Sequence, residues 1–431
     1  MKYTTFKDEM KKDYTILIPT MLPMHFSMFQ GVFEAYGYKT VLLSSTGTGV
    51  IERGLRYVHN DTCYPAQLVI GQLMEAVESG KYDTSKIALM ISQTGGGCRA
   101  SNYIHLLRKA LDRAGMGHIP VLSINFSGME KDSSLKMTIP MLRRLVAAVF
   151  YGDLLMTLRN QCRPYEICKG DTQKIADKWV AYLREELKNG RLCSGKDLKR
   201  TYPRIIEDFA AIPRRARNGV RVGIVGEIFV KFSPLGNNDL ESFLISEGAE
   251  PYLPDFLGFC LYCVYNGIVD HKLYGRGRLK AFGSKIIYKF LLRRQRAVIE
   301  AMEKEGTFDP PGYFEDTRKL LGDMMSVGMK MGEGWLLTAE MLELIKHGVT
   351  NIVCTQPFGC LPNHIVGKGM MKPLKEAYPE ANIVAIDYDA GATRVNQENR
   401  IKLMLANAKE KQKEAEAPGK AAEEKSETLT V

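Results

Sequence analysis

Long apolar runs are missing from this chain of 431 residues, although 45% of the residues are hydrophobic. No stretch approaches the roughly eighteen consecutive apolar residues that a membrane-spanning helix needs. Residues 1–12 are rich in Lys, Asp and Glu and lack the apolar core of a signal peptide. We therefore expect a cytoplasmic protein that does not enter a membrane and is long enough for two or three domains, each with its own core.

The common glycine-rich nucleotide loops are also absent. The segment TGTG at 46–49 lacks the Gly-Lys-Ser/Thr ending of a phosphate-binding loop, and GIVG at 223–226 lacks the dinucleotide-binding spacing. Glu227 follows the second of these segments, either at the edge of a cleft or in a structural turn. The sequence therefore predicts no ATP site of either type.

Closely spaced cysteine pairs are scarce among the nine cysteines. An odd number of cysteines without an export signal argues against a disulfide framework and favours thiols that stay reduced or bind metal. Cys260 and Cys263 have the C-x2-C spacing of zinc and cluster sites, but no second pair stands nearby and their neighbours are apolar. Three further cysteines, at 162, 168 and 193, fall in a helical region, and their sequence context gives little indication of metal binding.

Three single cysteines stand in a different context, in DTCYP at 61–65, GGGCR at 95–99 and FGCLP at 358–362. Each follows an apolar run that reads as a strand or helix, and flanking glycine or proline lets the backbone approach a bulky group closely. Cys98 and Cys360 follow predicted strands, and Cys63 precedes a predicted helix whose dipole we expect to lower the thiol pKa. We expect Cys63, Cys98 and Cys360 to meet in one cleft and hold an iron–sulfur cluster.

Other readings of these residues remain open. Cys354 lies within a predicted strand and is either a core thiol or a reserve cluster ligand. The three loop cysteines could also be separate buried residues, zinc ligands, or nucleophiles with His59 or His364 as the base.

The order of predicted elements indicates an α/β protein with two flavodoxin- or Rossmann-like parallel-sheet domains and helical insertions. Apolar strands alternate with amphipathic helices in the first part of the chain, and a second sheet begins at 220–226. We predict a first domain at 1–150, a helical linker region at 151–215, a second domain at 216–405 with a helical insertion at 284–331, and a disordered tail at 406–431. The cleft between the domains is the expected cluster site.

Part of the net charge of +10 comes from one short stretch of the chain. Eight basic residues fall between 276 and 296, and no acidic residue occurs between His271 and Ile299. This stretch is either the solvated face of an amphipathic helix or a docking surface for an acidic protein or anionic ligand. We do not expect binding to nucleic acid.

Taken together, four segments resemble the 2-hydroxyacyl-CoA dehydratase superfamily: HNDTCYPA at 59–66, QTGGGCRASNY at 93–103, VGEIFV at 225–230 and QPFGCLPNH at 356–364. More closely, the chain resembles a stand-alone form of the C-terminal region of large CoA-substrate-specific enzyme activases. The likeness runs from about residue 14 to 405 and includes GEGWLL at 332–337 and IDYD at 386–389.

The resemblance implies two flavodoxin-like domains around an iron–sulfur cluster, of the [4Fe-4S] or double-cubane type, held by Cys63, Cys98 and Cys360. It also implies a partner, an ATP-hydrolysing activase with an actin-like fold, which passes an electron to a component that reduces or dehydrates an acyl-CoA or another small molecule. Because no such ATPase module is visible in this sequence, the activase would be a separate chain. The alternative is a non-catalytic scaffold or regulatory partner of an activase with a structural cluster. Neither interpretation identifies the substrate, and whether the protein forms a dimer is left open.

Overall fold

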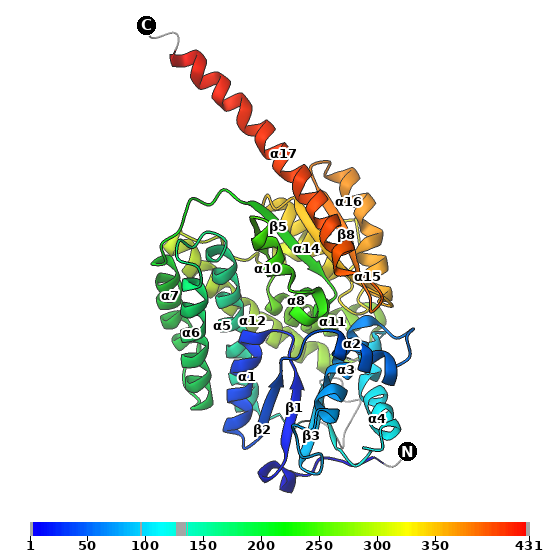
Figure 1. Cartoon of the computed structure of the whole chain (residues 1–431). Helices are drawn as coiled ribbons and strands as arrows, with labels where there is room; N and C mark the ends of the chain where they lie inside the picture. Colours follow the sequence, from blue (N-terminus) through cyan, green and yellow to red (C-terminus); the bar gives the residue numbers. More distant parts are fainter. Residues whose placement is uncertain (1–2, 95–96, 126–134, 136, 428–431) are drawn as a thin grey trace.

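Two four-stranded parallel sheets organise the molecule (Figure 1). The structure is a computed structural model that describes residues 3–94, 97–125, 135 and 137–427. The strand order is β2-β1-β3-β4 in the first sheet and β6-β5-β7-β8 in the second, so the two sheets share one topology. The α/β class with two parallel-sheet units, predicted from the sequence, is confirmed.

The first unit forms where short apolar runs alternate with helices. Strand β3 is buried at every position but one, as expected for a parallel sheet covered on both faces. Its elements are η1 (Asp8–Lys12), β1 (Thr15–Pro19), α1 (Pro23–Ala35), β2 (Lys39–Leu43), α2 (Thr48–Tyr57), α3 (Tyr64–Glu78), β3 (Ile87–Gln93), η2 (Arg99–Asn102), α4 (Tyr103–Arg113) and β4 (Val121–Asn125).

Three long helices follow: α5 (Ile139–Cys162), α6 (Asp171–Lys188) and α7 (Gly195–Ala210). Helix α1 of the first unit packs against both α5 and α6. The helical region therefore belongs to the body of the protein and is not an extended connector.

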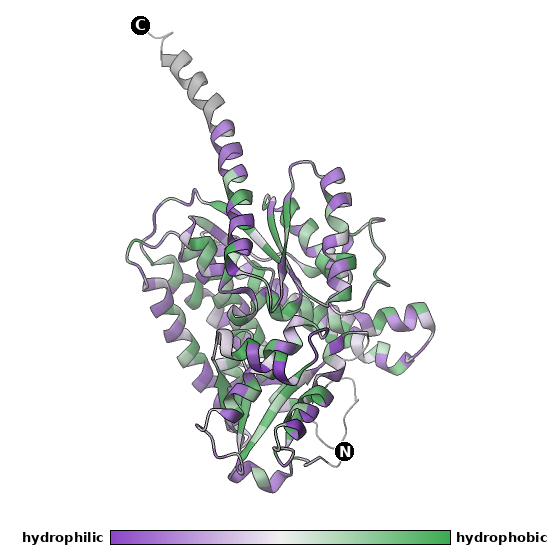
Figure 2. Cartoon of the chain, turned by 45° about the vertical axis from the view of Figure 1, so that its right-hand side comes forward, coloured by the Kyte–Doolittle hydropathy of each residue, from purple (hydrophilic) through white to green (hydrophobic). Residues whose placement is uncertain are grey.

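The second unit repeats the sheet but carries more helices. Its elements are β5 (Val220–Gly226), α8 (Ile228–Phe232), α9 (Pro234–Asn237), α10 (Leu240–Ser246), β6 (Ala249–Tyr252), α11 (Phe256–Tyr274), α12 (Arg278–Glu305), α13 (Phe314–Lys319), α14 (Trp335–Lys346), β7 (Asn351–Pro357), α15 (Leu361–Val366), η3 (Lys368–Met370), α16 (Met371–Ala377), β8 (Asn382–Tyr388) and α17 (Arg394–Glu427). Figure 2 shows apolar residues concentrated on the strands and polar residues on the outward faces of many helices.

Two parts of the second unit differ from the sequence-based expectation. The helical insertion begins at Phe256 with α11, well before residue 284, because the apolar segment before the basic stretch is itself helical. Residues 406–427 of the tail predicted to be disordered continue α17 as a helix, which projects from the body (Figure 1), and the rest of that tail lies outside the described residues. Lys, Glu and Ala are strong helix formers, so low apolar content there does not prevent a helix.

A buried carboxylate on α5 ties three parts of the fold together. Asp153 Oδ1 lies 2.9 Å from Nε2 of His25 on α1, and both residues are buried. The same carboxylate accepts hydrogen bonds from the backbone N–H groups of Phe256 and Leu257 at the start of α11. Asp153 thus anchors α1 of the first unit and α11 of the second unit to the helical region, and its negative charge suits the positive end of the α11 dipole.

Replacing Asp153 with Ala removes this anchor. The change leaves His25 and two helix N–H groups without their acceptor, so we expect the free energy of unfolding to fall by about 2–4 kcal/mol. Urea unfolding measures the effect. The matched change Asp177→Ala on the exposed face of α6 should stay within about 0.5 kcal/mol of the wild type. Equal effects of the two changes would contradict the anchoring role.

Candidate functional site

The loops that carry Cys63 and Cys360 are in direct contact, although they come from different sheets. The backbone N–H of Tyr64 donates to the carbonyl of Phe358 at 3.0 Å. Gly359 has φ +72°, and a Cβ at that position would lie 3.0 Å from the Cα of Cys63. Glycine is therefore required at 359 both for its backbone conformation and for this close approach.

The loop that carries Cys98 joins the Cys63 loop through two side chains. Arg99 Nη1 donates to the backbone carbonyl of Asp61 at 2.7 Å. The Tyr103 hydroxyl, at the start of α4, lies 3.1 Å from the sulfur of Cys63. Gly95 and Gly96 of this loop lie outside the described residues, so the structure places only its part from Gly97 onward.

A fourth loop, residues 329–334, completes the arrangement and was not predicted as part of the site. A Cβ at Gly97 would lie 2.7 Å from the sulfur of Met331, and one at Gly332 would lie 3.1 Å from the Pro362 side chain. This loop therefore packs against both the Cys98 loop and the segment just after Cys360. The Tyr262 hydroxyl of α11 donates to the carbonyl of Gly332 and holds the loop in place.

Two acidic residues face the thiols from the second unit. Glu227 caps α8 by accepting from the N–H of Val230, and Glu333 in the fourth loop accepts from the N–H of Ile228. Burial and the nearby carboxylate of Glu333 raise the pKa of Glu227 to about 8. Burial also raises the pKa of Glu333. Sequence reasoning left Glu227 open between a cleft edge and a structural turn, and it noted Glu333 only as part of the GEGWLL segment that carries the resemblance, with no role assigned.

The three thiols share one electrostatic environment. Burial, followed by the charge of Glu333, raises the pKa of Cys98 to about 12 and raises that of Cys360 further. The charge of Cys63 acts on the pKa of Cys98, and the charge of Cys98 acts on that of Cys360. The charge of Glu227 contributes to raising the pKa of each of the three thiols.

Burial outweighs the effect of the helix start on Cys63. Cys63 lies at the N-cap of α3, and burial raises its pKa, which the hydrogen bonds with Tyr103 and with the backbone N–H of Ala66 in α3 lower only in part. The environment favours protonated thiols at neutral pH, unless a positively charged centre stabilises the thiolates.

The remaining candidate residues have other neighbours. Cys354 is fully buried in β7, its sulfur lies 3.7 Å from Asn363 Oδ1, and the charges that act on it are those of Asp387, Lys368 and Glu340. His364 bonds through Nδ1 to the carbonyl of Cys360 and to Gln356, and exposed His59 contacts Asp61. Thus neither histidine is held against a thiol as a general base would be.

No set of three His, Cys, Asp or Glu side chains among the described residues is arranged to hold a single metal ion. This bears on zinc, which needs its ligands at about 2.0–2.3 Å from one point. A single-ion zinc site at these cysteines is therefore not supported within the described residues.

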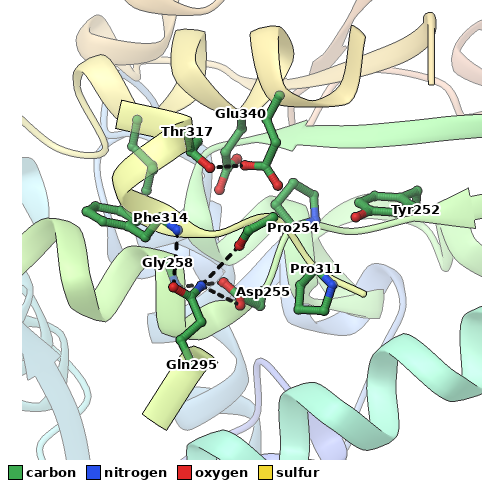
Figure 3. A pocket seen from close by; sticks show the side chains of 12 residues that line it. Tyr252, Pro254, Asp255, Gly258, Gln295, Pro311, Phe314, Thr317 and Glu340 are labelled. Atoms are coloured by element: carbon green, nitrogen blue, oxygen red, sulfur yellow. Dashed lines mark hydrogen bonds between the residues drawn. The ribbon is translucent and has the colours of Figure 1, made fainter. Parts of the chain in front are cut away.

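In the second unit, a small acid-lined cavity lies between α11, α12, α13 and α14 (Figure 3). Its volume of about 20 Å³ gives room for roughly one water molecule. Gln295 accepts from the N–H of Phe314 and donates toward Asp255, and Thr317 donates to Glu343 at 2.6 Å.

The buried carboxyl groups of the second unit act on one another's pKa values. Lys231 pairs with Glu340 at 2.8 Å, both side chains being nearly fully buried. Glu340 acts on the pKa values of both Glu343 and Glu333, and Glu333 acts on that of Glu227. The charge of Glu333 also contributes to raising the pKa values of Cys98 and Cys360.

Comparison with known families gives one match. Residues 15–84 match the family model described as CoA enzyme activase uncharacterised domain (DUF2229). This match relates the chain to the CoA enzyme activases. The matched part includes β1, α1, β2, α2, the Cys63 loop and α3. No curated protein matches the chain.

Among the described residues, no helix is both long and apolar enough to cross a membrane.

Glu343 should make stability depend on pH. Burial is the main cause that raises its pKa from 4.5 to about 7, so the folded state keeps a proton that the unfolded state loses. We expect its contribution to the free energy of unfolding to fall between pH 4.5 and pH 7 and then level off, by at most about 3 kcal/mol.

Urea unfolding at a series of pH values tests this against Glu343→Gln, which keeps an acceptor for Thr317. The variant should lose less stability than the wild type over that interval. Parallel stability curves for the two proteins would show that Glu343 does not titrate there.

Proposed function

We propose that this chain is an iron–sulfur protein that accepts electrons from a separate ATP-dependent activase and serves a reductase- or dehydratase-like reaction. The single observation that carries the proposal is the meeting of three cysteine loops from two domains. Hydrogen bonds join the Cys63 loop to both of the others. The match of residues 15–84 to a CoA enzyme activase domain supports the same context.

Three cysteine side chains on joined loops are the type of donor that a cluster of the [4Fe-4S] or double-cubane type takes. Iron–sulfur clusters are held by cysteine thiolates, and separate loops can supply them when the fold brings the loops together. Cys63, Cys98 and Cys360 would be the ligands, and three thiolates buried beside two carboxyl groups need a positively charged centre. A double cubane needs further thiolates, for which Cys354 is the reserve. When bound, such a cluster accepts and passes single electrons.

The chain's own side chains would tune this site. The Tyr103 hydroxyl is positioned to donate to the Cys63 sulfur, which stabilises the thiolate form. Glu227, whose pKa burial and Glu333 raise to about 8, can remain protonated near neutral pH and so avoid adding negative charge beside the thiolates. An acyl-CoA or another small molecule would be the substrate.

A non-catalytic scaffold that binds an activase is the second candidate, and the exposed basic and apolar face of α12 favours it. Electron uptake separates the two functions. A reductase component should be reduced by an activase in the presence of ATP, whereas a scaffold should bind the activase without a change in its own redox state.

Substitution of the loop cysteines tests the proposal. After anaerobic reconstitution with ferrous iron and sulfide, the wild type should contain iron and acid-labile sulfide and show broad visible absorbance. Cys63→Ala, Cys98→Ala and Cys360→Ala should each lose most of the bound iron, because each removes one of three ligands. Cys168→Ala, at an exposed cysteine away from the site, is the control and should keep it.

A wild-type protein that takes up no iron and sulfide would overturn the cluster proposal. So would full iron retention in all three loop variants.

A further inference from the structure

The start of helix α12 carries apolar side chains on its solvent side. Leu279 is 88% exposed, Phe282 65%, Ile286 56% and Phe290 44%. Their spacing of three, four and four residues puts them on one side of the helix. We call these four residues the α12 outer face.

The opposite side of the same helix is apolar as well. Tyr288, Leu291, Leu292 and Val298 are buried and belong to the hydrophobic core. A helix that is apolar on both sides is expected to be covered on both sides. Contiguous exposed apolar surface of this kind marks an interaction site, whereas single exposed apolar residues do not.

The charges beside this face are of one sign. Lys285, Lys289 and Arg293 are exposed on the same helix, and the sequence from 271 to 299 contains no acidic residue. Within the described part of the chain, none of the three forms an ion pair. Two copies that met symmetrically through this face would place like charges together, so the complementary occupant is acidic.

Exposed apolar residues continue from the α11–α12 connection toward the cysteine site. Leu273, near the end of α11, is 48% exposed, and its Cδ1 would lie 3.2 Å from a Cβ at Gly328. The following loop exposes Met329 and Met331, and Met331 packs against Gly97, next to Cys98. An occupant that covers this path reaches the rim of the thiol site, which suits a folded protein better than a flat lipid surface.

We propose that the α12 outer face, together with Met329 and Met331, is the docking surface for an acidic, partly apolar face of the electron-donating chain. This inference rests on the proposed function, which requires such a chain, and adds where it binds. The apolar stripe provides the buried centre of the contact, and the basic residues set its orientation and its rate of association. Docking here places the partner beside the loop that carries Cys98.

The test measures binding of a purified ATP-dependent activase to the full-length, reconstituted chain by sedimentation and by surface plasmon resonance at low and high salt. Lys285→Glu/Lys289→Glu should weaken binding about tenfold or more at low salt and reduce the salt dependence. Phe282→Ser/Phe290→Ser should weaken it at least as much with unchanged salt dependence. The matched controls are Lys375→Glu/Lys411→Glu and Leu403→Ser, at exposed positions on α16 and α17, and they should bind as the wild type does.

A second measurement is independent of affinity. A photocrosslinking amino acid at position 279 should link to the activase, and the same group at position 403 should not. Iron content, measured on every variant, shows whether the thiol site is intact, so failure of the cluster proposal is seen separately from failure of the docking proposal.

Three results would overturn the docking proposal. They are no binding of the activase to the wild type, equal binding by the face variants and the controls, and crosslinking from 403 but not 279. The face variants could instead lose self-association while activase binding is unchanged, which would assign the surface to a second copy of the chain. They could also lose binding to vesicles of phosphatidylglycerol and phosphatidylcholine while activase binding is unchanged, which would assign the surface to a membrane.

Discussion

The backbone contact between Tyr64 and Phe358 is the constraint on which the arrangement of the site depends. It joins the loop before α3 in the first unit to the loop after β7 in the second. The contact is possible because residue 359 is glycine, since any side chain there would press on the backbone of Cys63. The close approach of the two loops fixes Cys63 and Cys360, and Arg99 and Tyr103 bring Cys98 to the same place. The site is therefore a property of how the two sheets are assembled and of neither unit alone.

The chemistry of the site follows from where these loops are buried. Thiols and carboxyl groups that are removed from water are disfavoured in their charged forms, and here they also raise one another's pKa values. A group of buried thiols and carboxyl groups lowers the free energy of unfolding unless these groups stay protonated or a positively charged centre compensates their negative charges. Functional sites often concentrate perturbed groups in this way. The buried pair of Lys231 and Glu340 compensates part of the charge further from the thiols.

Much of the fold could be predicted because its strands are short apolar runs with clear ends. The predicted start of the second sheet at 220–226 coincides with β5. Helix α11 was missed because it is apolar on most sides and lacks the period that identifies a surface helix. The tail was misjudged because low apolar content was taken for disorder, whereas its residues favour a helix.

The site was harder to predict from the sequence than the fold. Glycine and proline around Cys63, Cys98 and Cys360 identified the loops, but spacing along the chain cannot show that distant loops touch. Burial reversed the expected effect of the α3 dipole on Cys63, and burial of one residue depends on the whole fold. Glu333 lies in the GEGWLL segment of the resemblance, but its place beside the thiols could not be predicted because it depends on the loop that packs against both Gly97 and Pro362. Domain limits, cluster type and partner remain predictions.

The most direct test of the central claim is a crystal structure of the anaerobically reconstituted protein, with anomalous diffraction measured at the iron absorption edge. The account predicts iron between the sulfur atoms of Cys63, Cys98 and Cys360, with the Tyr64 and Phe358 backbones still joined. Iron bound elsewhere, or the three sulfur atoms too far apart to share one centre, would contradict it.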